Sequence, residues 1–524
     1  MHIDIDYVTV ATTILGGVII GLLVFHFKRW RMYELSAKFD GPTCIPFLGN
    51  ALLFLRHPTD VLKVLETLLT VYPNSPLRLW LGPQLVVASF EPEQIKHVLS
   101  DARLIEKSTA FEMFQIGLGN GLLTAPAKIW QVNRKLMEPT FSRMFVAASV
   151  KKFAQHSKTL VKNMEKELDG SEFPIAEYIL DSAIDIIFDS TMGSTIAELG
   201  DVNRRFQEIT RKITELVYMR LFKPWFYWNV IFYRSALGKD LLSYKAAFSR
   251  ICEKAIERRK KLVLDETREK PEENLYNNND GTEFEKICLL DHFINFSVTN
   301  KIDKFSARDL HDELTTFIIA GYETTGFAMS SVLFLLSNFP DIQEKVYNEL
   351  YEIYGSDDLD EREVKYEDLS RMVYLERVIK ESLRLFPPAP YQTRFVTEDT
   401  KMEGHVLPKG CIWVACTFNL HRNAKYWENP LEFNPDRFLP GEIAKRRSHC
   451  WNPFGVGPRN CIGKRYGMMK MKTVLATVLR KYIVKKDTFV PIGEIELKLD
   501  IVLNTVLPFK LRIEKRVPKD PAGS

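Results

Sequence analysis

A glycine-rich stretch that ends in one cysteine and runs directly into a helical pattern constrains this chain more than any other feature. The stretch spans Phe454–Gly463, and the apolar periodicity after it predicts a helix over Lys464–Leu479. Cys461 therefore stands at a helix N-terminus, where unpaired backbone N–H groups and the helix dipole favour a thiolate over a thiol. Gly455 and Gly457 permit backbone conformations that turn the N–H groups of the loop towards the sulfur.

The residues around this cysteine suit a flat, acidic ligand. Gly463 has no side chain, so a planar group can lie against the backbone, and Arg459 can meet an acidic group at the ligand's edge. A lone thiolate beside a flat surface suits a haem iron, whereas a buried structural cysteine is the alternative. The complete pattern F-x-x-G-x-R-x-C-x-G resembles the haem-binding signature of the cytochromes P-450, the haem-thiolate monooxygenases. The resemblance implies that Cys461 is the axial iron ligand and that Phe454, Gly455, Arg459 and Gly463 contact haem b.

The composition narrows the functional classes. The chain has 524 residues, of which 46% are hydrophobic, enough for a large core. Its formal net charge of +4 is small for this length and argues against nucleic acid as the main partner. The 7 cysteines show no C-x-x-C spacing. They predict reduced thiols in a reducing compartment, and neither a disulfide framework nor a zinc cluster.

The N-terminal segment predicts a membrane anchor. Tyr7–Phe27 contains no Asp, Glu, Lys or Arg and is long enough for a helix to cross the hydrocarbon core. Lys28, Arg29 and Arg31 follow it, and the positive-inside tendency places them in the cytosol with the rest of the chain. A cleaved signal peptide would need a basic start and a small-residue cleavage site, and this segment has neither. A mitochondrial presequence would be amphipathic and rich in arginine, which this segment is not. In the family that the chain resembles, this topology belongs to the endoplasmic reticulum membrane.

These features predict one catalytic domain behind an anchor. Residues 1–31 are the expected anchor and basic flank, 32–50 a proline-rich hinge, and 51–524 a single haem-binding monooxygenase domain. Two prolines and two glycines within Gly41–Asn50 favour a stiff connector. The charged stretch Asp265–Thr282 predicts a solvated loop rather than a domain boundary. The resemblance implies a mainly α fold with small β-sheets, in which haem lies between a long distal helix and the helix after the cysteine loop.

The longest helical pattern beyond the anchor, Leu310–Phe339, contains the segment AGYETTG at Ala320–Gly326. Gly321 costs a helix about 1 kcal/mol relative to alanine and favours a local distortion. Glu323 and Thr324 are adjacent, so a carboxylate and a hydroxyl can together relay protons. A kinked core helix with an exposed Glu323 is the alternative. The segment resembles the family's A-G-x-D/E-T motif over the distal haem face, which assigns Glu323 and Thr324 to oxygen activation.

The resemblance also bears on how the haem is held. Ala320 lies against haem in this comparison, and some family members carry there a glutamate that forms an ester with it, so we expect non-covalent haem. Trp130 and Arg134 share a helix face, and their W-x-x-x-R spacing resembles the helix whose Trp and Arg bind a haem propionate. Any amphipathic helix can supply that spacing. Arg394 matches a position that pairs with a propionate.

A second group of charged residues predicts a structural network. Glu381 and Arg384 lie three apart on a helical pattern, which in isolation indicates a surface ion pair worth well under about 1 kcal/mol. The resemblance implies instead a buried network that Arg437 joins, bracing the loop under the cysteine. His421 is a tempting iron ligand, although a structural or propionate contact agrees better with the resemblance.

The substrate pocket cannot be derived from a local pattern. The resemblance places seven residues near it, with core packing as the alternative for those on the first stretch: Phe111, Phe114, Ile116, Phe317, Ala389, Tyr391 and Leu503. The aromatic stretch Lys223–Tyr233 can contact the membrane interface, roof an apolar cavity, or be buried between helices.

The basic helix after Cys461 suggests a protein partner. Lys464, Arg465, Lys470 and Lys472 crowd it, and although most charge runs are solvated faces, in this family a basic surface here docks an acidic flavoprotein reductase. The resemblance is strongest to the branch with fatty-acid omega-hydroxylases and many insect enzymes. It implies that electrons from NADPH and O2 hydroxylate an apolar small molecule such as a fatty acid, hydrocarbon, terpenoid, hormone or xenobiotic.

Two other functions are alternatives for a chain with this cysteine loop and anchor. One is a haem-thiolate isomerase or dehydratase that acts on peroxides without a reductase. The intact Glu323 and Thr324 and the predicted anchor argue against it. The other is a non-catalytic haem-binding or lipid-binding membrane protein, which a reductase-dependent product assay would exclude.

Overall fold

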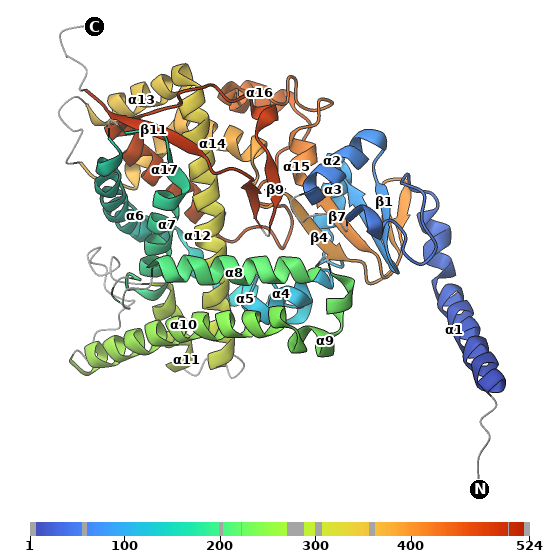
Figure 1. The fold of residues 1–524 in the computed structure, drawn as a ribbon. Coiled ribbons are helices and arrows are strands. Elements are labelled where there is room, and N and C mark those ends of the chain that lie inside the picture. Colours follow the sequence, from blue (N-terminus) through green and yellow to red (C-terminus); the bar gives the residue numbers. More distant parts are fainter. Residues whose placement is uncertain are drawn as a thin grey trace.

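The computed structural model describes residues 7–54, 60–168, 170–196, 198, 203–221, 223–269, 288–298, 306–355, 362–500 and 502–517. Helices predominate among them, and the strands form small sheets (Figure 1). The α-helices are α1 (Tyr7–Ser36), α2 (Val61–Val71), α3 (Pro92–Ser100), α4 (Ala110–Leu118), α5 (Ala127–Met137), α6 (Arg143–Met164), α7 (Ile175–Met192), α8 (Asn203–Leu221), α9 (Asn229–Arg234), α10 (Ala236–Glu269), α11 (Leu289–Val298), α12 (Ala307–Asn338), α13 (Pro340–Tyr354), α14 (Val373–Leu385), α15 (Thr417–His421), α16 (Pro440–Lys445) and α17 (Lys464–Lys481). The strands are β1 (Leu77–Leu81), β2 (Gln84–Ser89), β3 (Phe173–Pro174), β4 (Tyr391–Phe395), β5 (Thr400–Met402), β6 (His405–Leu407), β7 (Ile412–Cys416), β8 (Tyr482–Lys485), β9 (Leu497–Leu499), β10 (Leu503–Thr505) and β11 (Lys510–Lys515).

Helix α12 forms the centre of the molecule. Its N-terminus carries a capping box, in which the Ser306 hydroxyl accepts the Asp309 N–H at 3.2 Å and the Asp309 carboxylate accepts the Ser306 N–H at 2.8 Å. Most of its side chains are buried, and α7, α14 and α17 pack against it (Figure 1). The helix is continuous through Gly321. The predicted local distortion is therefore wrong, because packing on several sides outweighs the low helix propensity of one glycine.

A four-stranded sheet lies at the end of the molecule near α1 (Figure 1). Its order is β1-β2-β7-β4, with β2 parallel to β7 and the other neighbours antiparallel. Strands β1 and β2 form an antiparallel hairpin in which Leu77 pairs with Ala88. Strands β9 and β10 form a second hairpin, in which Leu503 pairs with Leu499. The parallel pairing of β2 with β7 and the position of β4 bring segments from both halves of the chain into one sheet.

Helix α1 projects from the domain (Figure 1). Its segment Val10–Ser36 is long and apolar enough to cross a membrane, and none of its most apolar window is buried. Helix α12 is the second helix that meets this test among the described residues, but it is largely buried and is therefore a core helix. Helix α1 continues to Ser36, past residue 32 where the hinge was expected to begin. The predicted loop 265–282 is helical up to Glu269 as the end of α10, and residues 270–287 lie outside the described part.

Candidate active site

Backbone hydrogen bonds and two left-handed glycines shape the loop before the cysteine. The N–H of Cys461 donates to the carbonyl of Phe454 at 2.9 Å and closes the loop. Gly455 and Gly457 have φ angles of +69° and +73°, a conformation that side chains other than glycine rarely adopt. A Cβ at Gly457 would also lie 1.9 Å from the carbonyl oxygen of Leu99. The turn that the sequence predicted is therefore present and requires glycine.

Cys461 is an exposed residue, and its surroundings raise the pKa of its thiol. Among the described cysteines, Cys461 and Cys44 are exposed and the others are buried. Loss of hydration raises the pKa of the Cys461 thiol, whereas the Gly463 N–H and the charges of Arg134 and Lys464 lower it. The net direction is opposite to the one predicted from the helix N-terminus, because desolvation outweighs the dipole and the N–H groups.

Helix α5 contacts the cysteine loop through one face. The guanidinium of Arg459 lies 4.7 Å from the centroid of the Trp130 ring. The guanidinium of Arg134 donates to the backbone carbonyl of Asn460 at 2.8 Å and to its side-chain oxygen at 3.0 Å. The predicted shared face of Trp130 and Arg134 is thus directed at the loop. Because Asn460 engages the Arg134 donors, contact of Arg134 with a propionate stays a prediction.

Three cations lie beside the loop, and two of them, Arg394 and Arg459, have unused hydrogen-bond donors. The buried Nε of Arg394 and the Nε and Nη1 of Arg459 have no hydrogen-bond partner. Burial lowers the pKa of Arg394 to about 10, and burial together with the Arg394 charge lowers that of Arg459 to about 9. Burial and the charges of both arginines also lower the pKa of Lys107. Among the described residues, no carboxylate is hydrogen-bonded to any of the three, although Glu106 acts on Arg459 from a distance.

This arrangement fits a haem group. Cys461 is exposed and lies close to Gly463, and Arg394 and Arg459 have buried donors that can bind carboxylates such as the two haem propionates. Sequence analysis missed Lys107, which also lies 4.3 Å from the centroid of the Phe111 ring. No local pattern marks this lysine, because its relation to Arg394 and Arg459 arises only from the fold.

The predicted charged network is assembled and buried. Arg384 binds Glu381 through two parallel hydrogen bonds of 2.7 and 2.8 Å, and both side chains are fully buried. The Nε of Arg437 lies 3.4 Å from the same carboxylate. Arg384 also donates to the backbone carbonyls of His421 at 2.8 Å and Pro430 at 2.7 Å. The network therefore joins α14 to the segment that leads towards the cysteine loop.

His421 belongs to this support and not to the ligand set. Its Nε2 accepts the backbone N–H of Asn452 at 3.0 Å, directly before the cysteine loop. Burial and the Arg384 charge lower the pKa of His421 to about 3, so the ring is neutral. The indole of Trp451 adds a second connection by donating to the Lys380 carbonyl at 3.1 Å. These bonds fix the approach of the chain to Cys461.

Glu323 and Thr324 lie on the central turn of α12. Burial, with the charge of Asp500 on the β9–β10 hairpin, raises the pKa of Glu323 to about 7. The Thr324 hydroxyl donates to the carbonyl of Ala320 at 2.7 Å. A carboxyl group that titrates near neutral pH can both accept and release a proton. The geometry is thus compatible with the proton relay, and its role stays a prediction.

The structure separates the residues predicted for the substrate pocket. Phe111, Phe114 and Ile116 lie on α4 and are half-buried, with the two phenylalanine rings 5.4 Å apart. Phe317 is buried, and its ring lies 5.2 Å from that of Phe141. Partial exposure suits the residues of α4 to contact with a ligand, whereas Phe317 packs into the core.

The remaining pocket candidates come from the β4 region and the C-terminal hairpin. Ala389 is exposed, and Tyr391 is half-buried with its hydroxyl donating to the Asn419 side chain at 3.2 Å. Leu503 is fully buried, and its N–H donates to the Pro388 carbonyl at 2.9 Å. The hairpin therefore lies against the segment that carries Ala389. These contacts among the described residues do not define one cavity shared by the seven candidates, so their assignment to the substrate pocket stays a prediction.

Sequence analysis also missed an acid of α12 that holds the glycine-rich segment after α4. The fully buried Glu313 carboxylate accepts the Leu122 N–H at 2.9 Å and the Asn133 side-chain amide at 2.7 Å. A few residues later, the Ala125 carbonyl accepts a hydrogen bond from Arg459 at 2.9 Å. Glu313 and Arg459 therefore hold the same segment, Glu313 at Leu122 and Arg459 at Ala125. No local pattern marks Glu313, because its partners Leu122 and Asn133 lie far away in the sequence.

We expect replacement of Glu313 by glutamine to change how stability depends on pH. Burial raises the pKa of Glu313 from an ordinary value of 4.5 to about 7. Between these values the folded protein binds more protons than the unfolded chain, so Glu313 makes stability fall as pH rises through this window. Glu313→Gln has no carboxyl group at this position, so its free energy of unfolding should not fall in this window. Relative to wild type, its free energy of unfolding should rise by roughly 3 kcal/mol between acidic pH and a pH above neutral. Thermal midpoints of both proteins from pH 5 to pH 8, roughly the same window, measure the difference.

Two of the four basic residues expected at a docking surface are not on the surface. Lys464 and Arg465 are exposed, whereas Lys470 and Lys472 are buried. Lys472 is paired with Glu376 at 2.5 Å. The prediction of a shared basic face is therefore wrong for Lys470 and Lys472, because α17 passes into the core after its first turn.

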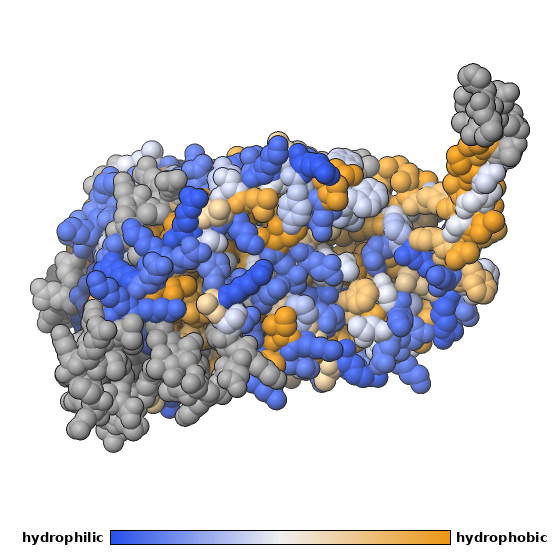
Figure 2. Space-filling view, turned by 90° about the horizontal axis from the view of Figure 1, so that it is seen from below, coloured by the Kyte–Doolittle hydropathy of each residue, from blue (hydrophilic) through white to orange (hydrophobic). Residues whose placement is uncertain are grey.

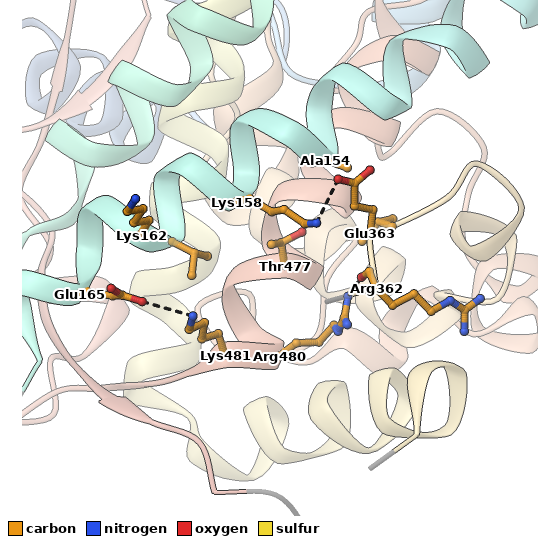
Figure 3. Close-up of a pocket in the computed structure, with 11 residues that line it drawn as sticks. Ala154, Lys158, Lys162, Glu165, Arg362, Glu363, Thr477, Arg480 and Lys481 are labelled. Atoms are coloured by element: carbon orange, nitrogen blue, oxygen red, sulfur yellow. Dashed lines mark hydrogen bonds and ion pairs between the residues drawn. The ribbon is translucent and has the colours of Figure 1, made fainter. Parts of the chain in front are cut away.

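A hollow of about 260 Å³ lies at the other end of α17, between its last turn, α6 and residues 362–364 (Figure 3). Two of its cations are paired, Lys158 with Glu363 at 3.0 Å and Lys481 with Glu165 at 3.3 Å. A helix of this length separates the hollow from Cys461 by roughly 25 Å. This hollow is therefore distinct from the cysteine site.

The comparisons agree with the site. A model of the cytochrome P450 family matches residues 40–512. The chain is 31% identical over 515 residues to cytochrome P450 4c21 of Blattella germanica, covering 97% of this chain and 99% of that one. It is 31% identical over 449 residues to cytochrome P450 4V2 of Homo sapiens, covering 84% and 83%. It is 30% identical over 453 residues to the probable cytochrome P450 4aa1 of Drosophila melanogaster, covering 86% and 85%.

Proposed function

This chain belongs to the cytochrome P450 family, and on that premise we propose that it hydroxylates an apolar small molecule with NADPH and O2 while anchored in the endoplasmic reticulum membrane. Family membership makes it a haem-thiolate monooxygenase that takes electrons from a reductase. The finer proposal concerns the substrate: a fatty acid, hydrocarbon, terpenoid, hormone or xenobiotic. The proposed function is carried by the exposed Cys461 beside Arg394 and Arg459, each of which keeps at least one buried donor without a protein partner.

The residues of the chain would divide the work as follows. Cys461 would ligate the iron, and Arg394, Arg459 and Lys107 would hold the propionates. Thiolate-ligated haem supplies O–O bond cleavage and oxidation of C–H bonds when bound. Glu323, with a pKa of about 7, would hold a proton at its carboxyl group and pass it along the Thr324 hydroxyl. The half-buried aromatic residues of α4 would exclude water from the substrate.

We propose that the haem is held without a covalent bond. Ala320 occupies the position at which some family members carry the ester-forming glutamate, and an alanine offers no carboxylate. Denaturation in acid and organic solvent should therefore release all of the haem from the wild-type chain. Mass spectrometry of the denatured polypeptide measures this, and a polypeptide that is heavier by one haem would contradict the proposal.

The membrane proposal rests on α1 and on a second apolar surface. Viewed from below, apolar side chains gather at the end of the molecule from which α1 projects (Figure 2). Large apolar side chains are exposed both in the hinge and in the aromatic stretch: Ile45, Phe47, Leu48, Trp225, Tyr227, Trp228, Val230 and Ile231. Within that stretch Phe226 and Phe232 are buried, so core packing holds for these two. Exposed tryptophan and tyrosine favour the headgroup region of a bilayer.

We propose NADPH–cytochrome reductase as the redox partner. Its acidic surface would meet the exposed Lys464 and Arg465 at the start of α17, directly after the iron-ligating cysteine. This position gives a short path for electrons to the site.

The test uses the full chain, loaded with haem in phospholipid vesicles with the reductase. Each substrate class is added with NADPH and isotopically labelled O2, and products are analysed by mass spectrometry. The proposal requires an NADPH-dependent product that carries one labelled oxygen atom. A product without label, or formed without NADPH, would instead support an isomerase or dehydratase.

A further inference from the structure

We infer that Lys470 is a positioning residue, which fastens the turn of α12 carrying Glu323 and Thr324 to the helix that follows Cys461. Its Nζ donates to the carbonyl of Gly321 on α12 at 3.3 Å and to the carbonyl of Ala183 on α7 at 3.1 Å. Three helices therefore meet at one amine. The inference rests on the role proposed above for Glu323 and Thr324.

The amine occupies a site that otherwise favours an apolar side chain. Lys470 is fully buried, and among the described residues no carboxylate pairs with it. Burial alone lowers its pKa to about 7. The Asp189 carboxylate on α7 is paired with Lys152 and His156 of α6, each at 3.0 Å. An uncompensated amine costs folding free energy that methionine at the same position would not.

The contact falls on the part of α12 that matters for the reaction. The Gly321 carbonyl also accepts the Thr325 hydroxyl at 2.7 Å, and the preceding carbonyl, that of Ala320, accepts the Thr324 hydroxyl. A Cβ at Gly467 of α17 would lie 3.6 Å from the Thr325 methyl group. Helix α17 thus touches this turn directly, one helical turn away from Lys470.

The physical consequence is a fixed relation between the two sides of the site. Helix α17 begins behind Cys461, and Lys470 joins it to the carbonyl two residues before Glu323. A shift of about 1 Å in a proton-delivering group is enough to lower the rate of its step strongly. Lys470 acts through the Gly321 backbone and touches no reacting atom. Its loss should therefore change how electrons are used more than how haem or substrate binds.

The effect is visible in the balance of products. In a coupled turnover, NADPH, H⁺, O2 and the substrate R–H give NADP⁺, R–OH and water. In an uncoupled turnover, NADPH, H⁺ and O2 give NADP⁺ and hydrogen peroxide, because the second oxygen atom is not released as water. The ratio of R–OH formed to NADPH consumed reports whether protons arrive at the right place.

The experiment compares Lys470→Met, Lys470→Gln and Lys472→Met in the haem-loaded full chain. Lys472→Met is the matched control, because Lys472 is buried on the same helix but binds Glu376 and the Leu369 carbonyl instead. We expect Lys470→Met to unfold at a higher temperature than wild type. Its amides at residues 321–326 should exchange hydrogen faster, and its coupling ratio should fall about threefold or more. Lys470→Gln keeps a donor and should stay within about twofold of wild type.

Wild-type amide exchange and coupling in Lys470→Met would overturn the inference, as would equal losses in Lys472→Met. If Lys470→Met does not fold, Lys470→Gln is the deciding variant. Slow amide exchange at residues 321–326 together with a wild-type coupling ratio supports the inference. Faster exchange or a lower coupling ratio in Lys470→Gln overturns it. Hydrogen exchange does not depend on turnover. Faster exchange without a change in coupling would therefore contradict the role proposed for Glu323 and Thr324, and not the anchoring by Lys470.

Discussion

Replacement of Cys461 by alanine is expected to lower NADPH-dependent product formation by about a thousandfold or more, the order of loss seen when an essential catalytic group is removed. The folded structure should survive, because Cys461 is exposed and its loop is closed by the backbone hydrogen bond from the Cys461 N–H to the Phe454 carbonyl. Arg394, Arg459 and Lys107, which we propose to bind the propionates, would still attract haem. The variant should therefore retain part of its haem while losing the thiolate bond that promotes O–O cleavage.

The measurement combines turnover with the absorption spectrum of the reduced protein under carbon monoxide. Thiolate ligation gives a strongly red-shifted band, and Cys461→Ala should lack it. Cys44→Ala is the matched control, because Cys44 is the other exposed cysteine and makes only long contacts of 3.7 Å to Pro42 and Asn50. It should keep both the band and the activity. A red-shifted band or wild-type turnover in Cys461→Ala would remove the basis of the proposed function.

Local patterns predicted the parts of the site that are local. The cysteine loop needs only a few consecutive residues, and its two left-handed glycines are present as expected. Helical spacing correctly placed Trp130 with Arg134 on one face and Glu381 beside Arg384. Each of these inferences depends on residues within one turn or one loop. The meeting of Glu381 with Arg437 came instead from the family resemblance.

Properties that depend on burial could not be predicted in this way. A run of basic residues after Cys461 looked solvated, yet Lys470 and Lys472 enter the core. The direction of the Cys461 pKa was wrong for the same reason, because desolvation is a property of the whole fold. Lys107 and Glu313 carried no signal, since their partners lie on other elements. Pattern reasoning therefore predicted the shape of the cysteine loop but missed much of what surrounds it.

Replacement of Arg384 by alanine should destabilise the fold by about 3 kcal/mol, the lower end of the cost of breaking a buried ion pair, because Arg437 still lies 3.4 Å from the Glu381 carboxylate. The Glu381 carboxylate would lose its two hydrogen bonds of 2.7 and 2.8 Å while remaining fully buried. The carbonyls of His421 and Pro430 would lose their donor as well. Because these bonds hold the segment that ends at the cysteine loop in place, haem content should fall together with the thermal midpoint.

An exposed pair with the same spacing provides the control. Glu442 and Lys445 also lie three residues apart, on α16, and form an ion pair of 2.7 Å at the surface. Lys445→Ala should leave the thermal midpoint and haem content unchanged, because water solvates both charges once the pair is broken. The double variant Glu381→Gln with Arg384→Met should recover part of the loss, since no buried charge is left unpaired. If Arg384→Ala behaved like Lys445→Ala, the network would not support the cysteine loop, and the position of Cys461 would have to be set by the contacts of α5 with Arg459 and Asn460.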